Sequence, residues 1–526
     1  MLAIMLAGSV TLATTYTDNT MPSGNITTTT DDPVEFDISN SATYSDVISG
    51  AGTVTKNGDG TLTLSNYDSS FTGDVYINSG TVLVTPQTYY SFIYAYNSCL
   101  GRKIAGRTIY INSGATLSLG NQDNFSTGGD DLPIVFVCDG GAINNPGTID
   151  IYEYNGKTRA YNFLQHTIFK NGATLHAVTG NESYKAYKLH DVKIVRNDDN
   201  SPAAPVTFTS DLTKVNATIC FGDRGGVISA GTSESTVNVG EITSADSSVN
   251  DGVSDLVISA IVANPTEGVS KVIKAGAGTM ELTAANTYTG PMTVSAGTLK
   301  FTDNAVVANG TVTVEDGATV EYNVSNGTTK LLTVASANQI SGNGELVKTG
   351  DGTLQIYTES AGLVQAESFV VSSGRLDMQE FFSGTLTVED DAQFSPGISI
   401  GSLEINGDFD LAQYATLLME IGGTDKDAND ILTVSGSVTY DPGAIVSFEV
   451  DSNSEYIPSI YDIVAVEMPE VDWDIVTFSS SKFYPIRYEN GIQYLGVVVP
   501  EPSTWAMLIL GVVGLMYWRK NAQKRA

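Results

Sequence analysis

The fold is decided by two segments within residues 274–301: Lys274-Ala275-Gly276-Ala277-Gly278-Thr279-Met280-Glu281-Leu282 and Gly297-Thr298-Leu299-Lys300-Phe301. In each segment a turn glycine precedes a run in which polar and apolar residues alternate. A period of two is typical of a β-strand that buries one face. The two segments therefore predict two strands of the same kind, each entered through a glycine turn.

The same pattern recurs along most of the chain, often at an interval of about 20 residues, as from Gly60 to Gly80 and from Gly297 to Gly317. A fixed interval of this length predicts a solenoid in which each period forms about one coil. Coils of a parallel β-helix stack about 4.8 Å apart and bury alternate apolar side chains. We therefore predict an all-β fold, a right-handed parallel β-helix over residues 19–390. The side chains expected to point into it are Leu62, Leu64, Val82, Val84, Met280, Leu282, Leu299, Phe301, Leu354 and Ile356.

Composition agrees with β structure and excludes several classes of protein. Of the 526 residues, 41% are hydrophobic, only 16% are charged and 52 are glycine, which disfavours both a helical bundle and a disordered chain. The net charge of −33 repels phosphate backbones, so no nucleic acid partner is expected. Cys99, Cys138 and Cys220 form no C-x-x-C pair, so we expect buried thiols and no zinc site or disulfide framework.

Three copies of the pattern are longer, at about residues 48–85, 258–301 and 340–378, and each contains a lysine before its glycine turn: Lys56, Lys274 and Lys348. These copies resemble the autotransporter-associated β-strand repeat. The resemblance implies the β-helical stalk of a secreted, adhesin-like passenger. The third copy lacks the Tyr-Thr-Gly segment found at Tyr288-Thr289-Gly290 in the second.

Residues 391–499 differ in character from the repeats and are expected to close the solenoid. The edge of a last open coil is a template for aggregation, so solenoids need a terminal cap. We predict that this segment forms a small β-sandwich.

Both ends of the chain read as processing segments. Residues 1–18 are predicted to be a signal-peptide-like segment with cleavage near Ala13, the alternative being a short buried strand. Near the other end, the 14 residues of 505–518 are apolar, with aromatic residues at both ends and a basic cluster after them. This order predicts a short transmembrane helix over 505–518 with Arg519 to Arg525 in the cytoplasm.

The segment 500–526 resembles the PEP-CTERM sorting signal, through Pro500-Glu501-Pro502, the apolar run, and the basic residues Arg519 and Lys520. The resemblance implies an exosortase-like sorting protease as partner, a membrane-anchored precursor, and delivery to the cell surface, outer envelope or extracellular matrix. It also implies a link to exopolysaccharide or biofilm. These residues would be the recognition element of a substrate, and none is catalytic.

One stretch of the solenoid is a candidate glycan-contacting face. Residues 151–200 are mildly basic in an acidic chain and hold the three histidines, His166, His176 and His190. Tyrosine rings stack on sugars and cations hold acidic polysaccharides. The residues expected to contact glycan are Tyr184, Lys185, Tyr187, Lys188 and Lys193. The alternative is lateral packing on an irregular part of the solenoid.

Other chemistry has less support. Asp425, Asp427 and Asn429 have a D-x-D-x-N spacing, but the glycine and glutamate of a calcium loop are missing, so a solvated turn is favoured over a weak calcium site. Polysaccharide lyases and glycosidases also use β-helices, yet no carboxylate or nucleophile motif stands at a suitable spacing. We therefore assign no catalytic residue, metal or cofactor and predict a non-enzymatic, surface- or matrix-associated protein. The alternative is a polysaccharide-binding or polysaccharide-degrading β-helix enzyme.

Overall fold

The computed structural model is all-β apart from one short 3₁₀ helix in the part of the chain that it describes. The described residues are 13–85, 97–102, 104, 106–120, 134–144, 153–154, 157–158, 162–165, 167–177, 187–190, 192–195, 205–211, 219–221, 233–240, 254–264, 270–303, 305, 310–337, 339–359, 362–451, 454–458, 463–470, 477–478 and 483–497. The chain divides into two compact units, the first comprising 1–323 with 336–347 and the second comprising 324–335 with 348–526.

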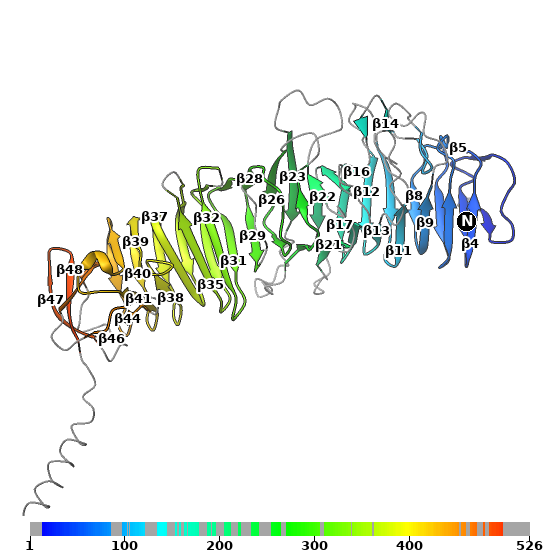
Figure 1. The fold of residues 1–526 in the computed structure, drawn as a ribbon. Coiled ribbons are helices and arrows are strands. Elements are labelled where there is room, and N and C mark those ends of the chain that lie inside the picture. The colour runs from blue at the N-terminus through cyan, green and yellow to red at the C-terminus, as the bar shows by residue number, and fades with distance from the viewer. Residues whose placement is uncertain are drawn as a thin grey trace, which may run out of the picture. The chain divides into compact units, whose positions relative to one another are not determined.

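In the first unit, consecutive coils pair in parallel and in register along two long ladders, whose strands lie side by side in Figure 1. Ladder 1 contains, in order, β1 (Thr14–Thr17), β3 (Val34–Asp37), β6 (Val54–Asn57), β8 (Val75–Ile77), β10 (Arg107–Ile111), β12 (Ile134–Asp139), β17 (Thr167–Lys170), β20 (Val192–Val195), β23 (Ser233–Gly240), β26 (Ser270–Ala275), β28 (Met292–Val294), β30 (Val312–Val314) and β33 (Ile340–Gly342).

Ladder 2 of the first unit includes the strands that begin at or directly after Gly60, Gly80, Gly278 and Gly297. Its strands are β4 (Ser41–Tyr44), β7 (Thr61–Leu64), β9 (Gly80–Val84), β11 (Ala115–Leu119), β13 (Ala142–Asn144), β18 (Thr174–Ala177), β21 (Val206–Ser210), β24 (Leu256–Ile258), β27 (Thr279–Leu282), β29 (Gly297–Thr302) and β31 (Ala318–Asn323).

Shorter pairings complete some coils of this unit. A third parallel face joins β16 (Asn162–Gln165), β19 (Tyr187–His190), β22 (Ile219–Phe221) and β25 (Val262–Ala263). A parallel pair joins β2 (Ile26–Thr28) to β5 (Ile48–Gly50), and an antiparallel pair joins β14 (Glu153–Tyr154) to β15 (Lys157–Thr158). The predominance of parallel pairing between successive coils agrees with the predicted solenoid.

The second unit continues the parallel arrangement. One ladder runs through β32 (Thr329–Val334), β35 (Thr353–Thr358), the first part of β37 (Arg375–Val388), β38 (Gln393–Ser395), β41 (Thr416–Ile421), β44 (Ile445–Val450) and β46 (Thr477–Phe478). The rest of β37 pairs with β36 (Gln365–Val371), β39 (Ser402–Asn406) and β40 (Phe409–Leu411). In turn, β39 pairs with β42 (Ile431–Val434) and β40 pairs with β43 (Val438–Tyr440). In the sequence β34 (Glu345–Thr349) lies between β33 and β35, and it pairs with β36.

The C-terminal segment differs from the sandwich expected over 391–499. Parallel pairing continues from β38 to β46, and the rings of Phe394 and Phe409 lie 5.6 Å apart in the core. In the described part of the second unit, antiparallel pairing comprises a small sheet of β45 (Ile463–Glu467), β48 (Ile492–Val497) and β47 (Phe483–Glu489), in that order, and an isolated bridge between Ile421 and Asn429. The reason is that residues 391–450 keep the inward alternation of the earlier coils, so they stack as coils.

The predicted core is confirmed. All ten side chains expected to point inward are buried, among them Leu299, Leu354 and Ile356, whose side chains are fully enclosed. The neighbouring threonines of the same strands, such as Thr298 and Thr353, are only partly covered. At the N-terminal end, residues 14–17 of the expected signal segment form β1 and pair with β3, whereas residues 1–12 lie outside the described residues.

We expect Leu299→Ala to lower the free energy of unfolding by about 2–5 kcal/mol, because the truncation leaves a cavity between Met280 and Val320, its register partners on the adjacent coils. Thr298→Ala, at the next, outward-facing position, is the control and should cost less than about 1 kcal/mol. Urea denaturation followed by circular dichroism measures both. Equal effects of the two substitutions would contradict the assignment of the core.

Candidate functional site

A buried lysine sits beside the glycine turn in each of the three long repeats. Lys56 is 1% exposed, yet its Nζ donates hydrogen bonds to three carbonyl oxygens, those of Asn57 at 2.7 Å, Gly58 at 2.6 Å and Ser79 at 3.2 Å. An ammonium group has three N–H donors, so the three carbonyls satisfy it completely. Two of them belong to the turn of its own coil and the third to the turn of the next coil.

The second and third repeats repeat this geometry. Lys348 donates to Thr349 at 2.9 Å, Gly350 at 2.6 Å and, across to the next turn, Ser373 at 2.9 Å. Lys274 donates to Gly276 at 2.7 Å, to Gly278, and across to Ala296 at 2.6 Å. In all three repeats, therefore, the lysine ties two stacked turns together through their backbones.

Glycine is required where these turns stack. Gly80, Gly297 and Gly374 follow the carbonyl that the lysine reaches on the next coil, with φ angles of 63°, 61° and 68°. A Cβ at Gly374 would lie 2.4 Å from the carbonyl oxygen of Gly350 and 2.5 Å from that of Gly352. The space between the turns thus admits backbone and one ammonium group but no further side chain.

Burial affects the titration of these lysines. It lowers the pKa of Lys348 to about 8, which still leaves the amine protonated at neutral pH. Burial also lowers the pKa of Lys56, and the nearby carboxylates of Asp37, Asp59 and Asp18 oppose that shift. The role of these lysines is not evident from the sequence alone. The signal in the sequence is that a lysine stands at the same position before the glycine turn in all three repeats, in a chain with only 26 lysines and arginines.

The structure separates the five residues expected to contact glycan. Lys193 in β20 is exposed on the outside of ladder 1. Tyr187 is fully buried, which corrects its expected role, because it alternates with Leu189 on the inward side of β19 and cannot reach a sugar. Tyr184 and Lys185 lie outside the described residues, and Lys188 is described only as part of strand β19.

The histidines and cysteines also occupy different settings. His176 in β18 is half-buried, and its Nδ1 lies 2.7 Å from Oγ1 of Thr209 on the next coil. Cys99 and Cys138 are buried, and burial raises the pKa of the Cys138 thiol to about 12, which keeps it protonated. His166 lies outside the described residues, and the side chains of His190 and Cys220 are not described.

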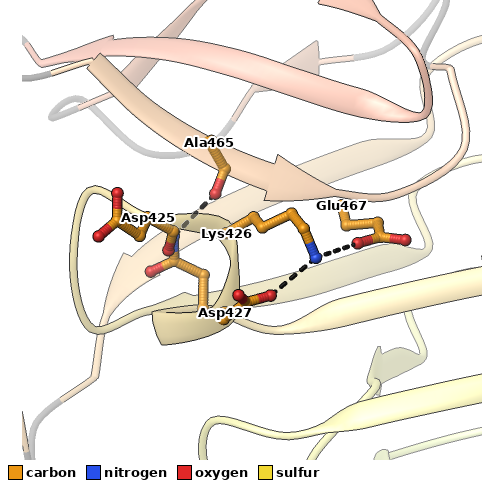
Figure 2. A network of polar contacts seen from close by, with 6 residues as sticks. Asp425, Lys426, Asp427, Ala465 and Glu467 are labelled. Atoms are coloured by element: carbon orange, nitrogen blue, oxygen red, sulfur yellow. Dashed lines mark hydrogen bonds and ion pairs between the residues drawn. The ribbon is translucent and has the colours of Figure 1, made fainter.

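The loop with calcium-like spacing serves a structural purpose in the second unit, as Figure 2 shows. It contains the 3₁₀ helix Lys426–Ala428. Lys426 Nζ lies 2.7 Å from Asp427 and 2.9 Å from Glu467 in β45. Asn429 Nδ2 donates to the carbonyls of Asp425 at 3.0 Å and Ala465 at 2.9 Å. These bonds fasten the terminal antiparallel sheet to the loop.

Asp430, at the end of this loop, is enclosed as well. Its carboxylate accepts the backbone N–H groups of Gly401 at 2.8 Å and Glu420 at 2.7 Å. Burial raises its pKa to about 7, although both N–H donors favour the ionised form. In the described part of the chain, no group of three or more His, Cys, Asp or Glu side chains is placed to hold a metal ion.

All five residues of the expected sorting element, Pro500, Glu501, Pro502, Arg519 and Lys520, lie outside the described residues, as does the segment 505–518. The described residues end with β48 in the terminal sheet. Within the residues that the structure describes, no helix has the length and apolar character needed to span a membrane.

Two segments of the chain match a known repeat family. Residues 54–84 and 272–301 match the passenger-associated-transport-repeat family. The chain carries autotransporter-type passenger repeats. Each matched copy covers four successive strands of two coils, which are β6, β7, β8 and β9 in the first copy. Each copy also contains all three carbonyls to which its lysine donates. Residues 340–378, where Lys348 shows the same turn geometry, lie after both matched segments.

Residues 498–521 match the PEP-CTERM protein-sorting motif, which includes Pro500 to Lys520. The chain is also 27% identical over 272 residues to the adhesin BmaC autotransporter of Brucella suis biovar 1 (strain 1330). That alignment covers 46% of this chain and 8% of the relative, so the chain spans only a small part of the adhesin that it matches.

Lys56→Met should lower the free energy of unfolding by about 1–3 kcal/mol, because it leaves buried carbonyl oxygens without a donor while keeping most of the side-chain volume. The exposed Lys193 is the matched control, and Lys193→Met should change stability by less than about 0.5 kcal/mol. Thermal and urea unfolding of the two variants tests this. A Lys56→Met protein as stable as the control would show that the ammonium does not hold the turns.

Proposed function

We propose that this protein is an exported, cell-surface or matrix-associated adhesin-like solenoid with a non-catalytic role. The observation that carries the proposal is the coincidence of passenger repeats with parallel coils and a C-terminal sorting motif in one chain. The partial similarity to an autotransporter adhesin supports the same class. Stacked coils present long columns of outward side chains, which is a suitable architecture for contact with extended partners.

The sorting motif supports processing by an exosortase-type protease. In this proposal Pro500, Glu501 and Pro502 form the recognised element. The apolar run 505–518 holds the precursor in the membrane, and Arg519 and Lys520 remain on the cytoplasmic side. Cleavage then releases the coils together with the terminal sheet of β45, β47 and β48, which precedes the motif in the sequence.

We further propose that the surface-displayed protein associates with matrix polysaccharide. The low content of charged residues, 16%, and the abundance of hydroxyl and amide side chains favour contact with a hydroxyl-rich polymer. Lys193, whose side chain is exposed on the outward side of β20, contributes to this contact in the proposal.

Intact-mass measurement of protein recovered from the cell surface should show loss of everything after about residue 502. Replacing Pro500, Glu501 and Pro502 together by alanine should leave the full chain in the membrane fraction. Alanine substitution of Ser503 and Thr504, which follow the motif, serves as the control and should leave processing intact. Recovery of Trp518 in the surface-exposed wild-type protein would instead support a permanent membrane anchor.

A further inference from the structure

The outer side of ladder 1 carries a continuous column of side chains, one from each successive coil. The residues of the column are unevenly spaced in the sequence. Parallel register aligns Tyr76, Tyr110, Val137, Ile168 and Lys193 on successive coils from β8 to β20. Each of them stands between two buried neighbours in its strand, so all five face outward. At the strand spacing of about 4.8 Å, the column is about 19 Å long.

The two tyrosines at one end of this column form a rigid aromatic pair. The ring centroids of Tyr76 and Tyr110 lie 4.8 Å apart and the ring planes differ by 5°, so the rings stack at the spacing of the coils themselves. Both side chains are half-buried. Stacking fixes the rings before any ligand arrives, which reduces the conformational entropy lost on binding.

A second, polar column runs beside the first at the end of the same strands. Asn57 donates to Glu35 at 2.6 Å, Asn78 donates to Asn57 at 2.8 Å, and Asn112 donates to Asn78 at 2.8 Å. An amide has two N–H groups, and the ladder engages one of them per residue. The column therefore presents a repeated amide edge, in step with the coils, beside the tyrosines.

The two columns carry few charges, one of which is the exposed cation Lys193. Further along the polar column, Asp139 is paired with Lys170 at 2.8 Å, so these two charges cancel. The whole chain carries a net charge of −33, which repels a polyanion at long range. An array of amides, aromatic rings and few net charges complements a polymer of hydroxyl groups and apolar ring faces.

We propose that the outward face of ladder 1 from β6 to β20 binds a neutral linear polysaccharide that lies along the ladder. Sugar rings contact Tyr76 and Tyr110 and the aliphatic part of the column, while hydroxyl groups bond to the ladder of Asn57, Asn78 and Asn112. This deepens and rests on the proposed association with matrix polysaccharide, and it assigns that association to a defined surface and to an uncharged ligand.

Affinity electrophoresis of the purified full chain tests the proposal, with native gels that contain hydroxyethylcellulose, mixed-linkage β-glucan, galactomannan or alginate. We expect retardation in at least one neutral gel and none in alginate. The double variant Tyr76→Thr/Tyr110→Thr should bind about tenfold more weakly. Threonine suits this position because Thr55 occupies it in β6, the preceding coil. Ile168→Glu, a separate variant in the same column, should also weaken binding.

Tyr357→Thr is the matched control, because Tyr357 is 37% exposed on strand β35 of the second unit, away from ladder 1 in the sequence. It should bind as the wild type does, and circular dichroism should show all variants folded. The proposal is overturned by wild-type migration in every neutral gel, by retardation in alginate alone, or by equal binding of the double variant and the control. A double variant that changes only sedimentation would assign the face to a second copy of this chain. Failure of the sorting experiment with intact binding would affect only the proposed export.

Discussion

In-register parallel hydrogen bonding between successive coils is the constraint on which the rest of this structure depends. Once a strand of ladder 1 pairs with its neighbour, every side chain on it is assigned to the inside or the outside, because strand side chains alternate. Residues that are far apart in the sequence then become neighbours in a column. Asn78 and Asn112, 34 residues apart, share a hydrogen bond in this way.

The turns are where this pairing is most vulnerable, since backbone carbonyls at a tight corner have no strand partner. The two passenger-type repeats, and the third copy with the same turn geometry at Lys348, meet the problem with a buried ammonium group that binds carbonyls from two coils at once. Desolvation of the lysine opposes this arrangement, and three hydrogen bonds to the charged group offset it. Glycine in the left-handed region lets the turns approach closely enough for one lysine to reach both. The repeat can thus be understood as a unit for holding two coils in register.

The surface follows from the same regularity. Each outward position on one coil has a counterpart at the same position on the next coil, although the residue type can differ. Such positions form rows, and the rows provide extended contact surfaces. The acidic character of the chain keeps such a stack soluble and discourages edge pairing. The terminal antiparallel sheet, fastened through Lys426 and Asn429, directly precedes the sorting motif in the sequence. The repeats and the motif together support a molecule that is made to be exported and displayed.

The sequence by itself determined the fold class, the inward alternation of residues such as Leu62 and Leu299, and the sorting motif near the C-terminal end, because each depends on local order along the chain. Only the tertiary structure decided which residues meet across coils. Coil lengths vary, with 21 residues from Asn57 to Asn78 but 34 from Asn78 to Asn112, so register cannot be counted from spacing. The tertiary structure alone shows that Tyr187, expected on the surface, is buried, and that the coils continue past residue 390. It also shows that Lys56 binds the turn of the next coil, because that turn lies beside it only in the folded stack.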